Sequence, residues 1–317
     1  MTAHPLRGRF SRHLRATGLL SETRLVIAAI SGGADSTALL HLLAPECRER
    51  GITLVGCHVA HGIRPRTGNL DARAAADHAA ALGLSFALRP FSALELRKHG
   101  ESLEAAARRI RYESFLALRE ELGPGALVAT GHTRNDQAET VLLNLERHLG
   151  RSRGGIRERR ADGVIRPLLP FSRNELRHFL AFEGLTFRED ESNLERRFAR
   201  NRIRLEVLPA LEARWPGVTE RLARAGARYT ERLERQDALL GSLIPSFEGP
   251  FPRSLFRELP EETLGRLLVR ATGTRGKVPG RAQILKVLAR LRGDQPGVRE
   301  SLGGLRVAAN SRFVRLT

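Results

Sequence analysis

The sequence predicts an α/β protein whose first half forms a Rossmann-like parallel sheet with helices on both faces. Four short apolar, strand-like runs in that half alternate with segments of helical periodicity. Strands that alternate with helices at this spacing form βαβ units, which pair in parallel. Two later helical patterns and a terminal pair of strand-like runs predict a second, smaller helical or α+β domain.

In order along the chain, the expected strands are Leu25–Ile30, Ile52–Val59, Leu84–Leu88 and Ala126–Thr130. The helices between and after them are Thr37–Arg48, Leu70–Leu82, Ser102–Glu121, Asp136–Leu149 and Arg173–Glu183. The basic N-terminal segment is expected to dock as a first helix. Ligands of such a sheet bind beyond the carboxyl ends of its strands, so the polar residues that follow the strands are candidates for a site.

A long helix is expected after the break at Arg214–Glu220, and its apolar residues predict packing on one side: Leu222, Ala225, Tyr229 and Leu233. Helices at Glu261–Ala271 and Ala282–Arg292 precede a hairpin whose turn is Gly303-Gly304. We therefore expect a catalytic domain over 1–212, a connecting helix over 213–245 and a small domain over 246–317.

The charge balance is strongly basic, with 53 Lys and Arg against 35 Asp and Glu, a net charge of +18. Such a surface attracts polyanions, nucleic acid first among them, although an arginine-rich genome would give the same balance. Two cysteines exclude a disulfide framework or a structural zinc site. No apolar run reaches the roughly 20 residues that span a membrane, so we expect a cytoplasmic protein without a membrane partner.

The segment SGGADS, Ser31 to Ser36, follows the first strand and has the glycines of a phosphate-binding loop without its lysine. Backbone N–H groups at a helix N-terminus bind an anion without a side-chain cation. Asp35 beside a phosphate requires a divalent cation between the two. The loop therefore indicates ATP with Mg²⁺, against the alternative of an ordinary capped turn.

Three further segments lie at strand ends or on the adjacent helices. CHVAHGIRP contains His58, His61 and Arg64, and ATGHTRNDQAET contains His132, Asn135, Asp136 and Glu139. SLEAAARRIRYESF has Glu104, Arg108, Arg111 and Tyr112 near one helical face. Each has an ordinary structural interpretation as a helix cap or a salt-bridged surface. A second carboxylate facing Asp35 is nevertheless what a Mg·ATP complex requires.

The SGGADS loop resembles that of the N-type ATP pyrophosphatases, or PP-loop enzymes. The four segments in this order, with VIRPLLPFSRNELRHFL and EDESNLERRFARNRIR after them, resemble the tRNA(Ile)-lysidine synthetases over about Leu25 to Pro209, and the chain length suits the family's shorter, two-domain form. The resemblance implies a ligase that joins free L-lysine to C2 of the cytidine at the first anticodon position of tRNA-Ile(CAU). ATP would adenylate the cytidine, so that AMP and pyrophosphate are released and the codon read changes from AUG to AUA.

The resemblance also implies roles for individual residues. ATP phosphates would be bound by Ser31, Gly32, Gly33, Ala34, Asp35 and Ser36, and Mg²⁺ by Asp35 and Asp136. Arg108, Arg111 and His132 would contact ATP or the adenylated intermediate, and Glu139 the lysine ammonium group. The candidate tRNA contacts are Arg147, Arg151, Arg200, Asn201, Arg202 and Arg204. The small domain is expected to bind tRNA, and a homodimer is one option for the oligomeric state.

Three departures from the family pattern affect substrate placement rather than the chemistry. Ala60 replaces an asparagine, Thr133-Arg134 replace a histidine and a small or apolar residue, and the loop around His148 is about one residue short. A tRNA thiolation enzyme remains an alternative, but such enzymes commonly use a C-x-x-C pair, and Cys47 and Cys57 do not form one. A basic RNA-binding protein with an inactive ATP site is the other alternative.

Overall fold

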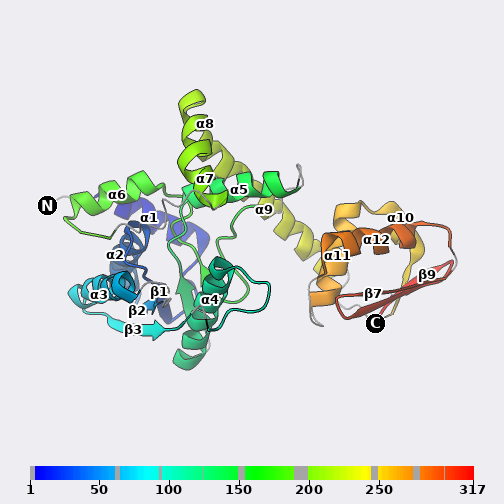
Figure 1. The fold of residues 1–317 in the computed structure, drawn as a ribbon, viewed down its shortest axis with the longest axis horizontal. Coiled ribbons are helices and arrows are strands. Elements are labelled where there is room, and N and C mark those ends of the chain that lie inside the picture. Colours follow the sequence, from blue (N-terminus) through cyan, green and yellow to red (C-terminus); the bar gives the residue numbers. More distant parts are fainter. Residues whose placement is uncertain are drawn as a thin grey trace. The chain divides into compact units, whose positions relative to one another are not determined.

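The computed structural model describes residues 4–60, 65–92, 95–123, 125–148, 154–188, 199–243, 249–273, 279–295 and 297–317. The chain divides into two compact units, Met1–Thr230 and Glu231–Thr317. Among the described helices, none combines the length and apolar character that a membrane-spanning segment needs. Figure 1 shows the helices and strands of both units.

The first unit contains a five-stranded parallel sheet in the order β3-β2-β1-β4-β5. Its strands are β1 (Leu25–Ala29), β2 (Thr53–Ala60), β3 (Ser85–Pro90), β4 (Leu127–Ala129) and β5 (Val164–Ile165). The four strands expected from the sequence are confirmed within two residues at each end. β5 was not expected, because two residues give no periodicity to detect.

The helices that precede the sequence break are α1 (Pro5–Thr17), α2 (Ala34–Glu49), α3 (Pro65–Ala81), α4 (Leu103–Leu122), α5 (Arg134–His148) and α6 (Arg173–Phe182). A short region of α7 (Ala199–Arg202), the π-helical turn η2 (Ile203–Val207) and α8 (Leu208–Arg214) leads to α9 (Val218–Leu243). α2 begins three residues earlier than expected. The last three residues of the SGGADS segment therefore form its first turn.

Alternate residues of β1 place helices on both faces of the sheet, because successive strand side chains point to opposite sides. Val26 and Ala28 pack into the core that contains residues of α1, α2 and α6. Ile27 instead packs with Phe115 and Leu118 of α4. In Figure 1, α2 and α4 accordingly lie on opposite sides of the strands. The expected α/β architecture is confirmed.

Helix α9 packs along one side, as predicted, but the centre of its packed stripe is shifted: of the four predicted residues, only Leu233 is buried. Its buried positions at 223, 226, 230, 233 and 240 follow three- and four-residue spacing, which defines a single stripe. Leu222 and Tyr229 lie at the edge of that stripe, and Ala225 is exposed, so its prediction as a packing residue was wrong. Within the stripe, Gly226 is required to be small, because Val141 and the backbone at Gly155 approach it closely.

The second unit packs three helices on a four-stranded antiparallel sheet in the order β6-β9-β8-β7. Its elements are β6 (Pro250–Pro252), α10 (Arg253–Glu258), α11 (Glu261–Gly273), α12 (Arg281–Arg292), β7 (Val298–Leu302), β8 (Leu305–Ala309) and β9 (Phe313–Leu316). Gly303 and Gly304 have φ values of 57° and 89°, as a two-residue hairpin turn of type I′ requires. The predicted hairpin and both longer helices are confirmed.

Candidate active site

The SGGADS segment joins the carboxyl end of β1 to the N-terminus of α2. Gly32 has φ +86°, and an added Cβ would lie 3.1 Å from the carbonyl oxygen of Asp71, so this position requires glycine. Inside the turn, the backbone N–H of Ser31 and the backbone carbonyl of Gly33 both hydrogen-bond the hydroxyl of Ser36, at 3.0 and 2.9 Å. The turn is therefore preformed by its own residues.

The first turn of α2 presents backbone N–H groups that no described side chain caps. Gly33 is the N-cap residue, and it has no side chain to accept from the helix. An uncapped helix N-terminus combines donor groups with the positive end of the helix dipole, which favours an anion. The local geometry therefore has the properties of a phosphate-binding loop.

Two arginines and three carboxylates form an ion-pair cluster beside this loop. Nη2 of Arg173 lies 2.6 Å from Oδ1 of Asp136, and its Nε lies 3.5 Å from Oδ2 of Asp35. Its Nη1 lies 2.6 Å from Oε1 of Glu139. One guanidinium group thus contacts carboxylates from the ends of β1 and β4, which are neighbours in the sheet.

Arg200 of α7 reaches the same cluster from the other side. Its Nε lies 2.9 Å from Oε2 of Glu139 and its Nη2 lies 3.1 Å from Oδ1 of Asp136. Glu139 is 1% exposed, with both oxygens engaged by arginines. The cluster therefore joins α5, α6 and α7 next to the loop.

Asp136 is fixed at the start of α5 by its own turn. Its Oδ2 accepts hydrogen bonds from the backbone N–H and the hydroxyl of Thr133, both at 2.8 Å. Thr133 is one of the departures from the family pattern, and here it positions a carboxylate of the cluster.

The two aspartates have opposite pKa shifts. Burial raises the pKa of Asp35 to about 6, and the charge of Asp136 raises it further while that of Arg173 lowers it. Burial alone would also raise the pKa of Asp136, but Arg173 and Arg200 outweigh it and hold this pKa well below its usual range. Asp136 is therefore ionised at neutral pH.

Arg108 and Arg111 of α4 do not share one set of neighbours. Arg108 lies over the ring of Tyr112, 5.4 Å from its centroid, whereas the charge of Arg111 acts on His58. His58 is buried, and its Nδ1 hydrogen-bonds the carbonyl of Ile30 at 2.8 Å. Arg111 therefore lies toward β2, whereas the charge of Arg108 also acts on His132, which follows β4.

His132 follows β4 and hydrogen-bonds the hydroxyl of Thr130 through Nδ1 at 2.9 Å. Burial lowers the pKa of His132 to about 3; Asp136 opposes this shift, while Arg166, Arg108 and Arg200 add to it. The imidazole is therefore neutral at physiological pH. It can act as a hydrogen-bonding group toward a nucleotide but not as a cation.

The predicted tRNA contacts lie in several places. Arg200 belongs to the ion-pair cluster, Arg202 is exposed on α7, and Asn201 and Arg204 are half-buried. The charge of Arg204 acts on Glu139, Asp136 and Asp35. The side chains of Arg147 and Glu104, and residues His61, Arg64 and Arg151, lie outside the described part of the chain.

Sequence reasoning assigned no role to Arg173 or Arg166, although both lie in segments quoted for the family resemblance. Arg173 starts α6, more than 30 residues from each carboxylate that it contacts. Arg166 follows β5 and is 4% exposed. The resemblance of these two segments to family motifs was the signal that could have identified Arg173 and Arg166 as site residues. An arginine at a helix start or after a two-residue strand otherwise looks like an ordinary surface residue.

The carboxylates of Asp35 and Asp136 have the donor chemistry that a Mg²⁺ ion requires. Mg²⁺ takes oxygen ligands, commonly one or two carboxylates together with substrate phosphates. In the described part of the chain, no group of three or more His, Cys, Asp or Glu side chains could hold a metal ion. The aspartates therefore fit an ion that enters with a phosphate ligand, and the guanidinium group of Arg173 lies between them.

Residues 6–211 match the PP-loop domain family. The chain belongs to the PP-loop family. Its curated relatives include tRNA(Ile)-lysidine synthases, as the ordered motifs predicted. That of Symbiobacterium thermophilum is 39% identical over 278 residues, 85% of this chain and 55% of the relative. That of Azoarcus sp. is 35% identical over 309 residues, 95% of this chain and 67% of the relative.

The tRNA(Ile)-lysidine synthase of Thermus thermophilus is 38% identical over 273 residues, 84% of this chain and 52% of the relative. This PP-loop chain therefore spans about half to two thirds of the length of these relatives. Among solved structures, the U34-tRNA thiolase NcsA from Methanococcus maripaludis has a TM-score of 0.57 at 20% identity, covering 71% of this chain and 79% of that chain. The two proteins share a fold.

Proposed function

We propose that this chain is a tRNA(Ile)-lysidine synthase, which ligates free L-lysine to C2 of the first anticodon cytidine of tRNA-Ile(CAU). The observation that carries the proposal is one arrangement at the carboxyl edge of the sheet. The uncapped N-terminus of α2 lies beside the carboxylates of Asp35 and Asp136. The similarity to curated enzymes of that name supports the choice of reaction.

In the first step, the C2 carbonyl oxygen of the cytidine attacks the α-phosphorus of ATP. The bond from the α-phosphorus to the bridging oxygen breaks, and pyrophosphate leaves. The N–H groups at the start of α2 are placed to bind the departing phosphates, which Ser36 supports by holding the turn closed. In the second step, the lysine ε-amine attacks C2, the C2–O bond breaks and AMP leaves.

Asp35 and Asp136 would hold Mg²⁺ in the ATP-bound protein, where the ion supplies neutralisation of the developing phosphate charge. Arg173 contacts the same two carboxylates. When ATP binds, its guanidinium group would retain Glu139 as a partner at 2.6 Å. Arg173 therefore helps to hold the carboxylates of Asp35 and Asp136 close together.

Glu139 is the proposed partner of the lysine ammonium group. Its present contacts show what the ammonium group would have to displace or share. Both of its oxygens are engaged, by Arg173 at 2.6 Å and Arg200 at 2.9 Å. An incoming ammonium group must therefore replace or join one of these arginines. Arg200 is the less buried of the two, with 31% of its side chain exposed against 14% for Arg173, so we expect Arg200 to move.

The RNA substrate is proposed from chemistry and charge. The net charge of +18 favours a polyanion. The cytidine must leave the anticodon stack before its C2 oxygen can react. Arg202, which is exposed on α7, is the most accessible of the described predicted tRNA contacts. We further propose that the second unit binds the body of the tRNA.

The cysteines argue against sulfur transfer as the reaction. Cys47 and Cys57 are both buried and free, and they lie on α2 and β2. Burial raises the pKa of each thiol to about 12. Because the thiolate is the reactive form, neither cysteine is suited to carry sulfur at neutral pH.

Incorporation of labelled lysine into purified tRNA tests the proposal. With ATP and Mg²⁺, label should enter tRNA-Ile(CAU) and not elongator methionine tRNA. Asp136→Asn should lower the rate by about 100-fold or more, because it replaces a charged oxygen ligand by an amide and leaves Arg173 and Arg200 with one anionic partner fewer. Asp77→Asn, an exposed position on α3, is the matched control.

Two results would contradict this assignment. RNA-dependent cleavage of ATP to AMP without lysine incorporation would keep adenylation and reject lysine as the nucleophile. Neither signal with folded protein would favour an RNA-binding protein without catalysis. Circular dichroism of each variant separates lost chemistry from lost structure.

A further inference from the structure

The SGGADS turn is held from outside by the segment that follows α6. The backbone N–H of Arg188 donates to the carbonyl oxygen of Gly32 at 3.0 Å, and Gly33 forms a parallel bridge with Arg188. Arg188 comes after all five strands of the sheet in the chain. The turn between β1 and α2 is therefore fixed by a distant part of the sequence as well as by its own hydrogen bonds.

Helix α3 contacts the same glycine. An added Cβ at Gly32 would lie 3.1 Å from the carbonyl oxygen of Asp71 and 3.4 Å from its Cα, so the backbone of α3 lies directly against the turn. The side chain of Asp71 also reaches the segment after α6, because its Oδ1 accepts a hydrogen bond from Nε of Arg188 at 2.6 Å. One ion pair thus connects the two elements that contact Gly32.

A second contact joins α3 to this segment without involving the turn. His78 lies two helical turns after Asp71, on the same face of α3. Its Nε2 lies 2.9 Å from the carbonyl oxygen of Thr186, two residues before Arg188. This contact would keep the segment against α3 if the ion pair between Asp71 and Arg188 were removed.

The hydrogen bond from Arg188 sets the direction of the peptide between Gly32 and Gly33. In a trans peptide, the carbonyl and the following N–H point in opposite directions. Because the carbonyl of Gly32 faces Arg188, the N–H of Gly33 faces the inner side of the turn. The hydroxyl of Ser31 accepts from it there, but at 3.4 Å, which is longer than an ordinary N–H···O hydrogen bond. This N–H is therefore oriented as a donor to a bound phosphate would be.

We propose that Asp71 and Arg188 are positioning residues for the ATP phosphates, and that their ion pair holds the peptide between Gly32 and Gly33 in its phosphate-binding orientation. This rests on the proposed function, in which the turn binds the departing phosphates. Neither residue lies in the segments that carry the family resemblance. Adjacent glycines have many accessible backbone conformations, so an outside restraint lowers the cost of ordering the turn when phosphate binds. A donor that is already oriented also needs no reorganisation while charge develops on the leaving group.

A direct effect of charge predicts a different result for Asp71. A carboxylate near a bound phosphate repels it, so removal of Asp71 would strengthen phosphate binding if charge alone mattered. If Asp71 instead holds Arg188 against the turn, its removal weakens phosphate binding. The sign of the change in Asp71→Ala therefore separates the two explanations.

The test measures binding of magnesium pyrophosphate and, separately, of adenosine to the full chain by titration calorimetry. Pyrophosphate reports on the turn, whereas adenosine has no phosphate and reports on the rest of the nucleotide site. We expect Asp71→Ala and Arg188→Ala each to bind pyrophosphate about 5-fold more weakly and adenosine within about 2-fold of the unmodified chain. Because the two side chains act as one pair, the double variant should also lose about 5-fold rather than about 25-fold.

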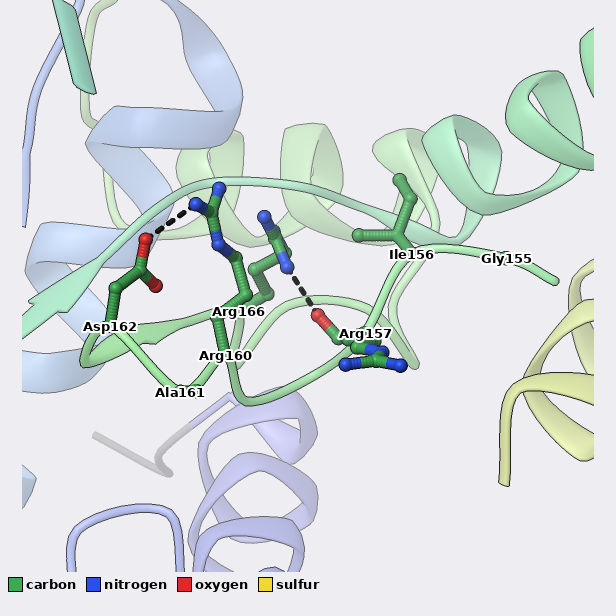
Figure 2. Close-up of a pocket in the computed structure, with 7 residues that line it drawn as sticks. All are labelled: Gly155, Ile156, Arg157, Arg160, Ala161, Asp162 and Arg166. Atoms are coloured by element: carbon green, nitrogen blue, oxygen red, sulfur yellow. Dashed lines mark hydrogen bonds and ion pairs between the residues drawn. The ribbon is translucent and has the colours of Figure 1, made fainter. Parts of the chain in front are cut away.

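Asp162→Ala is the matched control. Figure 2 shows the ion pair between Asp162 and Arg160, whose side chains are 32% and 37% exposed, close to the 30% and 37% of Asp71 and Arg188. Asp162 precedes β5, so it lies at the amino edge of the parallel sheet, opposite the SGGADS turn. This variant should bind pyrophosphate within about 2-fold of the unmodified chain.

Three results would overturn the proposal. Unchanged or tighter pyrophosphate binding by Asp71→Ala, with weaker binding by Arg188→Ala, would show that Arg188 acts through its own charge. Losses that multiply in the double variant would show that the two residues do not act as a pair. Equal losses of pyrophosphate and adenosine affinity would show a general loss of structure, which circular dichroism of each variant checks.

These measurements require neither tRNA nor lysine. If the unmodified chain binds pyrophosphate, the variants behave as expected and no lysine is incorporated, the proposed function fails and the positioning role stands. If lysine is incorporated but Asp71→Ala binds pyrophosphate as well as the unmodified chain does, the positioning role fails and the proposed function stands.

Discussion

At the scale of single residues, the candidate site is an alternation of carboxylates and guanidinium groups. Asp35, Asp136 and Glu139 would repel one another strongly if they were buried alone. Arg173 contacts all three, and Arg200 contacts two of them. Removal of one partner from such a buried network leaves uncompensated charge, at a cost of about 3 to 5 kcal/mol. The charge balance of the site therefore depends on its ion pairs rather than on any single residue.

A residue-scale prediction concerns His41 on α2. Its Nε2 lies 3.1 Å from Nδ1 of His78, whose Nε2 lies 2.9 Å from the carbonyl oxygen of Thr186. Because Nε2 of His78 must donate to that carbonyl, Nδ1 of His78 is the nitrogen that faces His41 and can accept from its Nε2. Burial, with a contribution from His78, lowers the pKa of His41 to about 4.

The unfolded chain therefore binds a proton at His41 near pH 6.5, before the folded protein does. Between pH 6.5 and about 4 the free energy of unfolding should fall with falling pH, by up to about 3 kcal/mol from this residue. His41→Gln should flatten that part of the profile. Urea denaturation at pH 7.0 and 4.5 measures the difference, and an identical profile in the variant would contradict the assignment.

At the scale of elements, the strands are short, and the candidate site residues lie where strands end and helices begin. β1 and β4 each end at a turn that contributes to the ion-pair cluster, and β5 ends next to the buried Arg166. Parallel strands bring these junctions to one edge even though they are separated by tens of residues in the chain. In the second unit, the junctions are instead held together by one buried arginine.

Arg253, at the start of α10, is 2% exposed and donates to backbone carbonyls at the end of α12 and in the turns that flank the sheet. The acceptors are the carbonyl oxygens of Arg290, Leu291, Gly293, Gln295 and Asn310. These include terminal carbonyls that a helix cannot satisfy by itself. Its side chain therefore connects α10, α12 and the β8–β9 turn.

Arg253→Met should destabilise the second unit by roughly 3 to 5 kcal/mol, because several buried acceptors would lose their donor. Arg257→Met is the control, since that side chain is nearly half exposed and pairs with Asp294 at the surface; it should cost under about 1 kcal/mol. Thermal unfolding followed by circular dichroism compares the two. Equal destabilisation by both variants would mean that surface charge matters more than the buried bonds.

At the scale of the whole molecule, the described residues of each unit form hydrophobic clusters of their own. The first unit contains the largest cluster and two smaller ones, and the second unit has a separate core from α10–α12 and its sheet. The first unit ends at Thr230, which lies within α9, and the remainder of this helix belongs to the second unit. Since each unit buries its own apolar surface, each can lose its structure without requiring the other to do so.

We therefore expect calorimetry to resolve two unfolding transitions. Arg253→Met should lower the midpoint of one transition and leave the other within about 1 °C. Added Mg·ATP should raise the transition that Arg253→Met does not affect, because a ligand stabilises only the unit that binds it. A single transition that both treatments move together would show that the units unfold cooperatively.

The sequence by itself determined the fold class, six of the helices within three residues at each end, the first four strands and the SGGADS loop. These features depend on hydrophobic periodicity, on glycines in turns and on helix-start residues, all of which can be recognised within a short contiguous stretch of sequence. It also indicated Asp35, Asp136 and Glu139 as one group, because the strand ends they follow meet at one sheet edge.

Only the tertiary structure decided which cations complete that group. Arg173 and Arg200 reach it from α6 and α7. The packed face of α9 was likewise decided by what lies against it, including Val141. An ion pair between distant residues leaves no periodic trace in either segment, so its partners become visible only when the chain has folded.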